Sequence, residues 1–226
     1  MPERKAPLPG WLGGIEPPAL AGIDPALFES VRAAYDSPGR FYHTWDHILT
    51  CLGEYRATTF DEPRAVLLAL LFHDAVYVAG RKDNEAKSAE LADRTLARLS
   101  DVPADERQRV AQMIRFTADH HAAAAASPDA RKMLDIDLAV LGADWPTYSA
   151  YADGVRREFC PAVTTESMFR IGRSRFLRAV LAQPHVFLTD AARARREPTA
   201  RENIARELSD LEREMGVAGR VIGRLP

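Results

Sequence analysis

Apolar residues recur at helical spacing along almost the whole chain from Pro25 onward. Two of these amphipathic segments open with proline in the first turn, where proline favours helix formation. Nowhere do four to eight β-branched residues alternate with polar ones between turns, and no fixed-period repeat occurs. We therefore expect an all-α fold. The predicted helices cover residues 24–37, 42–57, 62–80, 83–100, 102–121, 130–142, 144–159, 164–183 and 197–216.

The segment 62–80 differs from its neighbours because Ala65 through Phe72 carry no polar side chain. It is rich in leucine and alanine rather than in β-branched residues, which favours a helix over a buried strand. A helix that is apolar all round is one that other helices surround. We expect this segment to be the central core helix.

The first 24 residues contain several prolines and glycines and are predicted to form an irregular N-terminal arm. Residues 25–226 are then expected to form one helical domain. The chain has 226 residues, of which 46% are hydrophobic and 27% charged, as in ordinary globular proteins. A chain of this length buries enough apolar surface to fold without disulfides or structural metals.

A net charge of −2 argues against binding driven by bulk electrostatics, so neither nucleic acid nor a membrane is expected as a partner. No run approaches the roughly 18–20 apolar residues of a membrane span, and the N-terminus lacks a signal-peptide core. The two cysteines, Cys51 and Cys160, form no C-x-x-C pair. We expect a cytoplasmic protein. The amphipathic segment 200–216 either closes the core or pairs with a second chain as a homo-oligomer.

The stretch "YHTWDHI" places His43 and His47 four residues apart. On a helix these side chains share one face, and metalloproteases use the same spacing to hold zinc with two imidazoles. The alternative is that one histidine is hydrogen-bonded within the core and the other is exposed.

Other ionisable residues stand among apolar ones. His73 and Asp74 follow the apolar run, where an ionisable pair is costly unless it is paired or binds a metal. Asp135 and Asp137 are interleaved with leucine and isoleucine, so at least one is expected to point inward, although a solvated turn is the alternative. Histidines with carboxylates suit a divalent ion that keeps open positions.

These residues and their spacing resemble the H…HD…D signature of HD-domain metal-dependent phosphohydrolases. The resemblance extends to a subgroup of predicted HD phosphohydrolases and covers most of the chain, from about Tyr35 to Leu208. The motifs that carry it are "RFYHTWDHI", "FHDAVY", "DNEAKSA", "IRFTADHH", "DIDLAVLG", "YSAYADGVRREF" and "EPTARENI". It implies a divalent ion held by His47, His73, Asp74 and Asp137, with Asp135 as the alternative last ligand.

The opening motif is also similar to the "YHN-x-x-H" of cyclic-nucleotide phosphodiesterases, although Thr44 stands here in place of asparagine. That similarity implies that His43 donates a proton to the leaving oxygen. By resemblance to related nucleotidases, Asp83 orients the attacking water, and its alternative role is to cap the next helix. Asp74, bound to the ion, is a second candidate to steer that water.

Four residues are candidates for substrate binding. Arg40 and Arg156 offer guanidinium forks that suit a phosphate, and Tyr42 belongs to the opening motif. His120 stands at the subgroup's I-x-x-T-x-x-H position, whereas helical geometry places His121 closer to the face of the preceding apolar residues. The alternative for Arg156 is an ion pair with Glu158.

The function we expect is metal-dependent hydrolysis of a phosphate ester, with a nucleotide or other small phosphomonoester as substrate. The cofactor is a divalent ion: manganese, iron, cobalt, nickel, zinc or magnesium. One alternative is a sensor domain that binds metal and nucleotide without turnover. Another is a dinuclear iron oxygenase of the same superfamily, which needs further histidines between the HD pair and the last aspartate.

Overall fold

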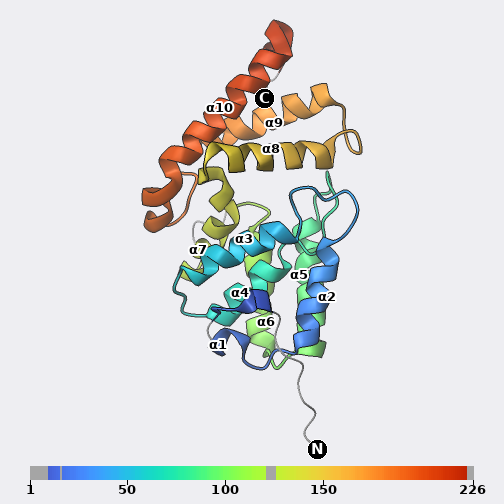
Figure 1. Cartoon of the computed structure of the whole chain (residues 1–226), viewed down its shortest axis with the longest axis vertical. Helices are drawn as coiled ribbons and strands as arrows, with labels where there is room; N and C mark the ends of the chain where they lie inside the picture. Colours follow the sequence, from blue (N-terminus) through green and yellow to red (C-terminus); the bar gives the residue numbers. More distant parts are fainter. Residues whose placement is uncertain (1–9, 16, 121–125, 223–226) are drawn as a thin grey trace, which may run out of the picture. The chain divides into compact units, whose positions relative to one another are not determined.

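The structure, a computed structural model, describes residues 10–15, 17–120 and 126–222, and it confirms an all-α fold for them (Figure 1). Within these ranges there is no strand, and no helix is both long and apolar enough to cross a membrane. The elements are η1 (Gly10–Leu12), α1 (Pro17–Leu20), α2 (Pro25–Tyr35), α3 (Trp45–Arg56), α4 (Pro63–Phe72), α5 (Asn84–Leu99), α6 (Ala104–Phe116), α7 (Pro128–Asp137), η3 (Leu138–Gly142), α8 (Trp145–Phe159), α9 (Glu166–Ala182) and α10 (Asp190–Ile222).

The chain forms two compact units, Met1–Asp137 and Leu138–Pro226. The described part of the N-terminal arm belongs to the first unit and contains two short helical turns, η1 and α1. Its apolar residues Leu12 and Ile23 are buried. A single β-bridge joins Ile23 to Ser100 at the end of α5. The arm is therefore part of the first unit's packing.

Helix α4 is the centre of the first unit, as its apolar sequence predicts. Every residue from Ala65 to Phe72 is fully or almost fully buried. The helix packs against α1, α3, α5, α6 and α7. Because α4 begins at Pro63 and ends at Phe72, the His73–Asp74 pair follows directly after its last turn. The core helix thus delivers both ionisable residues to one place.

Several predicted helix boundaries differ from the structure and affect the site. Helix α4 ends at Phe72 and not at residue 80, so His73 and Asp74 follow the helix instead of lying within it. Helix α7 ends at Asp137 and not at residue 142. Helix α3 begins at Trp45 because Thr44 is extended, with φ −106° and ψ 178°, so His43 precedes the helix instead of lying on it. Helix α6 ends at Phe116, and the Thr117 hydroxyl donates to the carbonyl of Ile114 at 2.7 Å. His120 consequently lies in the turn after α6. The helical argument that favoured His121 does not apply, and His121 itself lies outside the described residues.

The second unit is built from η3 and the helices α8, α9 and α10. Its core contains seven buried residues: Leu141, Tyr148, Leu177, Val186, Phe187, Ala200 and Ile204. A Cβ added at Gly142 would lie 2.6 Å from Arg196 Cβ, so only glycine allows η3 to approach α10 this closely. Helix α10 begins at Asp190 and continues through Pro198, whereas the sequence predicted a start at Glu197.

Candidate metal centre

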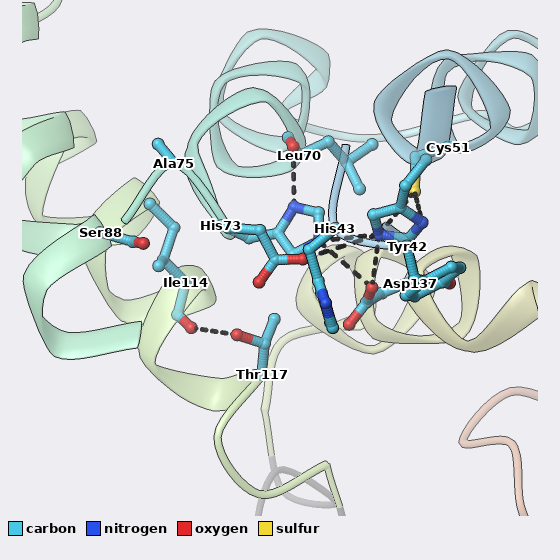
Figure 2. Close-up of polar contacts among 12 residues, drawn as sticks. Tyr42, His43, Cys51, Leu70, His73, Ala75, Ser88, Ile114, Thr117 and Asp137 are labelled. Carbon is cyan, nitrogen blue, oxygen red and sulfur yellow. Dashed lines mark hydrogen bonds and ion pairs between the residues drawn. The ribbon is translucent and has the colours of Figure 1, made fainter. Parts of the chain in front are cut away.

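Four side chains of the first unit converge from the ends of three helices. His47 lies in the first turn of α3, His73 and Asp74 follow α4, and Asp137 is the last residue of α7. Figure 2 shows His73 and Asp137 pointing toward one another, with Cys51 and His43 beside them. The sequence prediction thus names residues that the fold brings together across 90 positions.

The distances within this cluster are short. His47 Nε2 lies 3.1 Å from His73 Nε2, and both nitrogens lie 3.2 Å from Asp137 Oδ1. Asp74 Oδ2 lies 3.1 Å from His73 Nε2 and 3.8 Å from His47 Nε2. Two imidazole nitrogens and two carboxylate oxygens therefore face one small common volume.

The His73 ring is oriented by the backbone of α4. Its Nδ1 donates to the carbonyl of Leu70 at 2.8 Å, and its side chain is only 1% exposed. A histidine that donates from Nδ1 presents the Nε2 lone pair to a metal, and such a partner commonly orients a metal-binding histidine. The ring is held in this orientation by the same helix turn that ends at Phe72.

Burial and charge oppose each other in this cluster. Burial alone would lower the pKa of His73, but the carboxylates of Asp74 and Asp137 raise it well above its usual range. Burial alone would raise the pKa of each carboxylate, yet His73 above all holds both pKa values below their usual range. In the metal-free protein the negative charges are thus balanced by a proton on His73, and a cation can take that proton's place.

The donor set fits a divalent metal ion. Zinc and magnesium hold nitrogen and oxygen ligands at about 2.1 Å, so adjacent ligands of an octahedral ion lie roughly 3 Å apart. The distances among His47, His73 and Asp137 have this value. The groups His47–His73–Asp74 and His47–Cys51–Asp137 each place three ligand atoms within 4.8 Å of one another. Imidazole with carboxylate accommodates several first-row metals, so the metal's identity stays open.

The two aspartates of "LDIDLAVLG" have different surroundings. Asp137 contacts three histidines: Oδ1 faces His47 and His73, and Oδ2 lies 3.1 Å from His120 Nε2. Asp135 is buried on α7. Of the two alternatives, Asp137 is the one in the cluster, and His120 joins it through the second carboxylate oxygen.

His43 lies beside the cluster, half-buried in the loop before α3. Its ring stacks on Tyr77, with centroids 4.0 Å apart and planes at 23°, and Tyr42 contacts it edge-on at 4.9 Å. The His43 and His47 rings are 6.4 Å apart. Tyr42 also lies against His47 at 4.9 Å. Both residues predicted from the opening motif therefore line the cluster.

Three other predicted residues are engaged elsewhere. Asp83 is bound by Arg81 through two hydrogen bonds of 2.8 and 2.7 Å and is about half exposed. It makes no side-chain cap to α5, and the described contacts do not join it to the histidines. Arg156 lies on α8 in the second unit, where it pairs with Asp153 and Glu166.

Arg40, predicted to bind phosphate, is 9% exposed and donates to backbone carbonyls. Arg40 is thus held by backbone carbonyls, and Asp83 and Arg156 are held by ion pairs with nearby residues. The sequence shows that these residues are charged but not which partner each one binds.

Neighbouring polar residues brace the turn that follows the HD pair. Ser88 accepts from the Val76 amide at 3.0 Å and donates to its carbonyl at 3.2 Å. Asn84 makes the same two-way contact with Val78, at 3.1 and 3.0 Å. Both side chains are buried. The first turn of α5 therefore holds residues 76–78 in place beside Asp74.

Cys51 is a site residue that the sequence analysis missed. Its buried Sγ lies 3.7 Å from His47 Nε2, one helical turn along α3. Burial, followed by the charges of Asp137 and Asp74, raises the pKa of its thiol well above the usual range. The thiolate and not the thiol binds metal, so the raised pKa disfavours Cys51 as a ligand, although its Sγ is near enough to His47 and Asp137 to reach the site. Its spacing of four from His47 was the signal available in the sequence.

No family model matches this chain, and no curated protein matches it either.

Replacing Asp137 by asparagine is predicted to weaken divalent-metal affinity by more than about 100-fold. Mutating a residue that only hydrogen-bonds to a metal ligand weakens affinity by roughly 10–100-fold, and Asp137 is itself a proposed ligand. The change removes a charged oxygen that faces both imidazoles. Asp135→Asn is the matched control and should stay within a few fold of wild type. Competition against a fluorescent chelator measures both affinities. Equal losses in the two variants would contradict the assignment of Asp137.

Metal binding is also predicted to release protons. The pKa of His73 is raised in the metal-free protein, so below that pKa a metal must displace a proton from Nε2. Affinity should consequently fall as pH is lowered, by about tenfold per unit for each proton released. Calorimetry at one pH in buffers of different ionisation enthalpy counts the protons. An affinity that does not change between pH 8 and 5.5 would contradict this prediction.

Proposed function

We propose that this protein is a metal-dependent phosphohydrolase of the HD type. The observation that carries the proposal is the convergence of His47, His73, Asp74 and Asp137, with distances among their ligand atoms of 3.1 to 3.8 Å. The order of these residues along the chain is that of the H…HD…D signature. A divalent ion bound there would lower the pKa of a water, for zinc from about 15.7 to around 7, and would polarise a phosphoryl oxygen.

The chain's own residues supply the remaining requirements of the reaction. His47 and His73 bind through Nε2, and the Leu70 carbonyl keeps the proton of His73 on Nδ1 when the ion is bound. Asp74, which follows α4 and has a side chain 15% exposed, is the carboxylate that would orient a water there. His120, against the outer oxygen of Asp137, is positioned to contact a substrate phosphate.

His43 is the proposed proton donor to the leaving oxygen. Its ring face is occupied by Tyr77, so the ring nitrogens at its edge are the groups that exchange a proton. It lies beside His47 without being one of the four converging ligands. A well-placed acid of this kind contributes roughly 10²–10⁴ to the rate. The loop position of His43, ahead of α3, separates proton transfer from metal binding.

Both cysteines are free thiols, which suits the reducing environment of the cytoplasm.

The substrate class follows from the family resemblance: a nucleotide or another small phosphomonoester. Arg40 and Arg156 are bound to other groups, so the positive charge that meets the phosphate comes chiefly from the metal centre. This favours substrates whose phosphate is terminal and accessible.

A sensor domain is the second candidate, and one observation favours it. Asp83, proposed to orient water, is instead bound by Arg81 at the surface. A protein that binds metal and nucleotide without turnover needs no such base. The dinuclear oxygenase depends on a second ion, for which His120 and the outer oxygen of Asp137 are the available ligands. The number of metal ions per chain distinguishes it from the hydrolase.

His47→Ala and His43→Ala are predicted to fail in different ways. His47→Ala should lose bound metal and hydrolysis together, because it removes a ligand nitrogen. His43→Ala should keep the metal and slow turnover by roughly 10²–10⁴-fold, because it removes only the proton donor. Metal content and released phosphate are measured on protein stripped with chelator and reloaded with each metal. The substrates are nucleoside mono-, di- and triphosphates, cyclic nucleotides and sugar phosphates.

His185→Ala is the control for the general effect of removing a histidine, since His185 is exposed in the second unit. It should retain both metal and activity. Tight metal binding by the wild type with no turnover on any substrate would favour the sensor. Full activity in both His43→Ala and His47→Ala would contradict the site assignment itself.

A further inference from the structure

Arg40 ties together the two sequence motifs that form the site. Its Nη1 donates to the carbonyl of His43 at 2.9 Å and to that of Asp74 at 2.7 Å. Its Nη2 donates to the carbonyl of Ala75 at 3.0 Å. One guanidinium thus joins the loop before α3 to the turn after α4.

The same side chain also supports the ring against which His43 packs. The Arg40 guanidinium carbon lies 5.1 Å from the ring centre of Tyr35 and 5.5 Å from that of Tyr77. Tyr77 in turn stacks on the His43 imidazole at 4.0 Å. Arg40 therefore contacts the backbone of His43 directly and its ring through Tyr77.

A phosphate-binding role conflicts with this geometry. Turning the guanidinium toward a phosphate would leave the carbonyls of His43, Asp74 and Ala75 without this donor, and a buried carbonyl that loses its partner is destabilising. The hydrogen bonds need a planar fork with several fixed donors, which arginine has. Lysine keeps the positive charge but has a single compact ammonium. Arg40→Lys therefore shows whether the planar arrangement of donors, and not the charge alone, is needed.

We propose that Arg40 is a positioning residue that sets the place of the His43 imidazole relative to Asp74, and through it the efficiency of proton transfer. The effect on rate rests on the function proposed above. The structural half of the proposal, that Arg40 holds His43 against Tyr77, is independent of any activity.

The first test measures the position of His43 directly. The ring current of Tyr77 shifts the His43 ring protons upfield when the rings stack at 4.0 Å. In Arg40→Lys these protons should move toward the values of an exposed histidine, while metal content stays that of wild type. The His43 signals are assigned by their loss in His43→Gln. Unmoved His43 signals in folded Arg40→Lys would overturn the proposal, whether or not the protein hydrolyses anything.

Arg201→Lys is the matched control. Arg201 also donates to three backbone carbonyls, those of Leu181, Gln183 and Pro184, at 3.1, 2.8 and 2.9 Å, all within the second unit. It should leave the His43 signals in place. If Arg40→Lys does not fold, Arg40→Gln replaces it, because a neutral amide lacks the guanidinium fork while the Tyr77 ring that reports on His43 is retained. The same displacement of the His43 signals is then expected.

The second test compares the turnover of two phosphate esters whose leaving groups differ in their need for a proton. An alkyl phosphate needs an acid to protonate its leaving oxygen, whereas 4-nitrophenyl phosphate scarcely does. Arg40→Lys should slow turnover of the alkyl ester by roughly 10–100-fold and that of the nitrophenyl ester by less than about threefold, with KM unchanged. Combined with His43→Ala, it should cause no further loss, since both changes act on one step.

A rise in KM on both esters, with the His43 signals in place, would show that Arg40 binds the phosphate and would overturn the proposal. If the wild type turns over neither these esters nor any substrate of the nucleotide and sugar-phosphate panel, the hydrolase assignment fails and the nuclear magnetic resonance result alone decides whether Arg40 positions His43. The two failures are therefore distinguishable.

Discussion

The charge of two carboxylates in a largely water-free space is the constraint on which the site depends. Asp74 and Asp137 face the same pair of imidazole nitrogens, and their side chains are 15% and 14% exposed. Carboxylates so placed require a compensating positive charge. A proton on His73 provides it when no metal is bound, and a divalent ion bound there would provide it more completely. The raised pKa of His73 and the lowered pKa of both aspartates are two descriptions of this one requirement.

The first unit is organised so that this cluster can form. The buried helix α4 ends where its last carbonyls can orient His73, and Leu70 provides the acceptor. Helices α3 and α7 contribute His47 and Asp137 from their own ends. Side chains at helix ends can be brought close without separating the helix backbones. Asn84 and Ser88 brace the turn after Asp74, and Arg40 braces it from the opposite motif.

Much of this arrangement was predictable from sequence, because burial and chemistry act together there. The unbroken apolar run of α4 predicts a core helix, and an ionisable pair directly after it predicts a functional role for His73 and Asp74. The choice between Asp135 and Asp137 could not be made from the residues alone, since both alternate with apolar residues; only the family resemblance favoured Asp137. It depends on the rotation of α7 against α3 and α4, which only the packed structure contains.

Residues with several available partners were the least predictable. Arg40 was predicted to bind a phosphate, but its guanidinium donates hydrogen bonds to three backbone carbonyls and packs against two tyrosine rings. Asp83 could have met the cluster or capped α5, but Arg81, two residues away, binds it. The start of α3 was also not predicted, because the extended backbone of Thr44 places His43 before the helix.

The most direct measurement is X-ray absorption spectroscopy of the protein loaded with one equivalent of zinc. The account predicts a shell of nitrogen and oxygen atoms at about 2.0–2.1 Å, with the outer scattering of two imidazole rings and no sulfur. His47 and His73 supply those rings, and the raised pKa of the Cys51 thiol disfavours its binding as a thiolate. A sulfur scatterer at about 2.3 Å, or a single imidazole in the fit, would contradict the assignment of the metal centre.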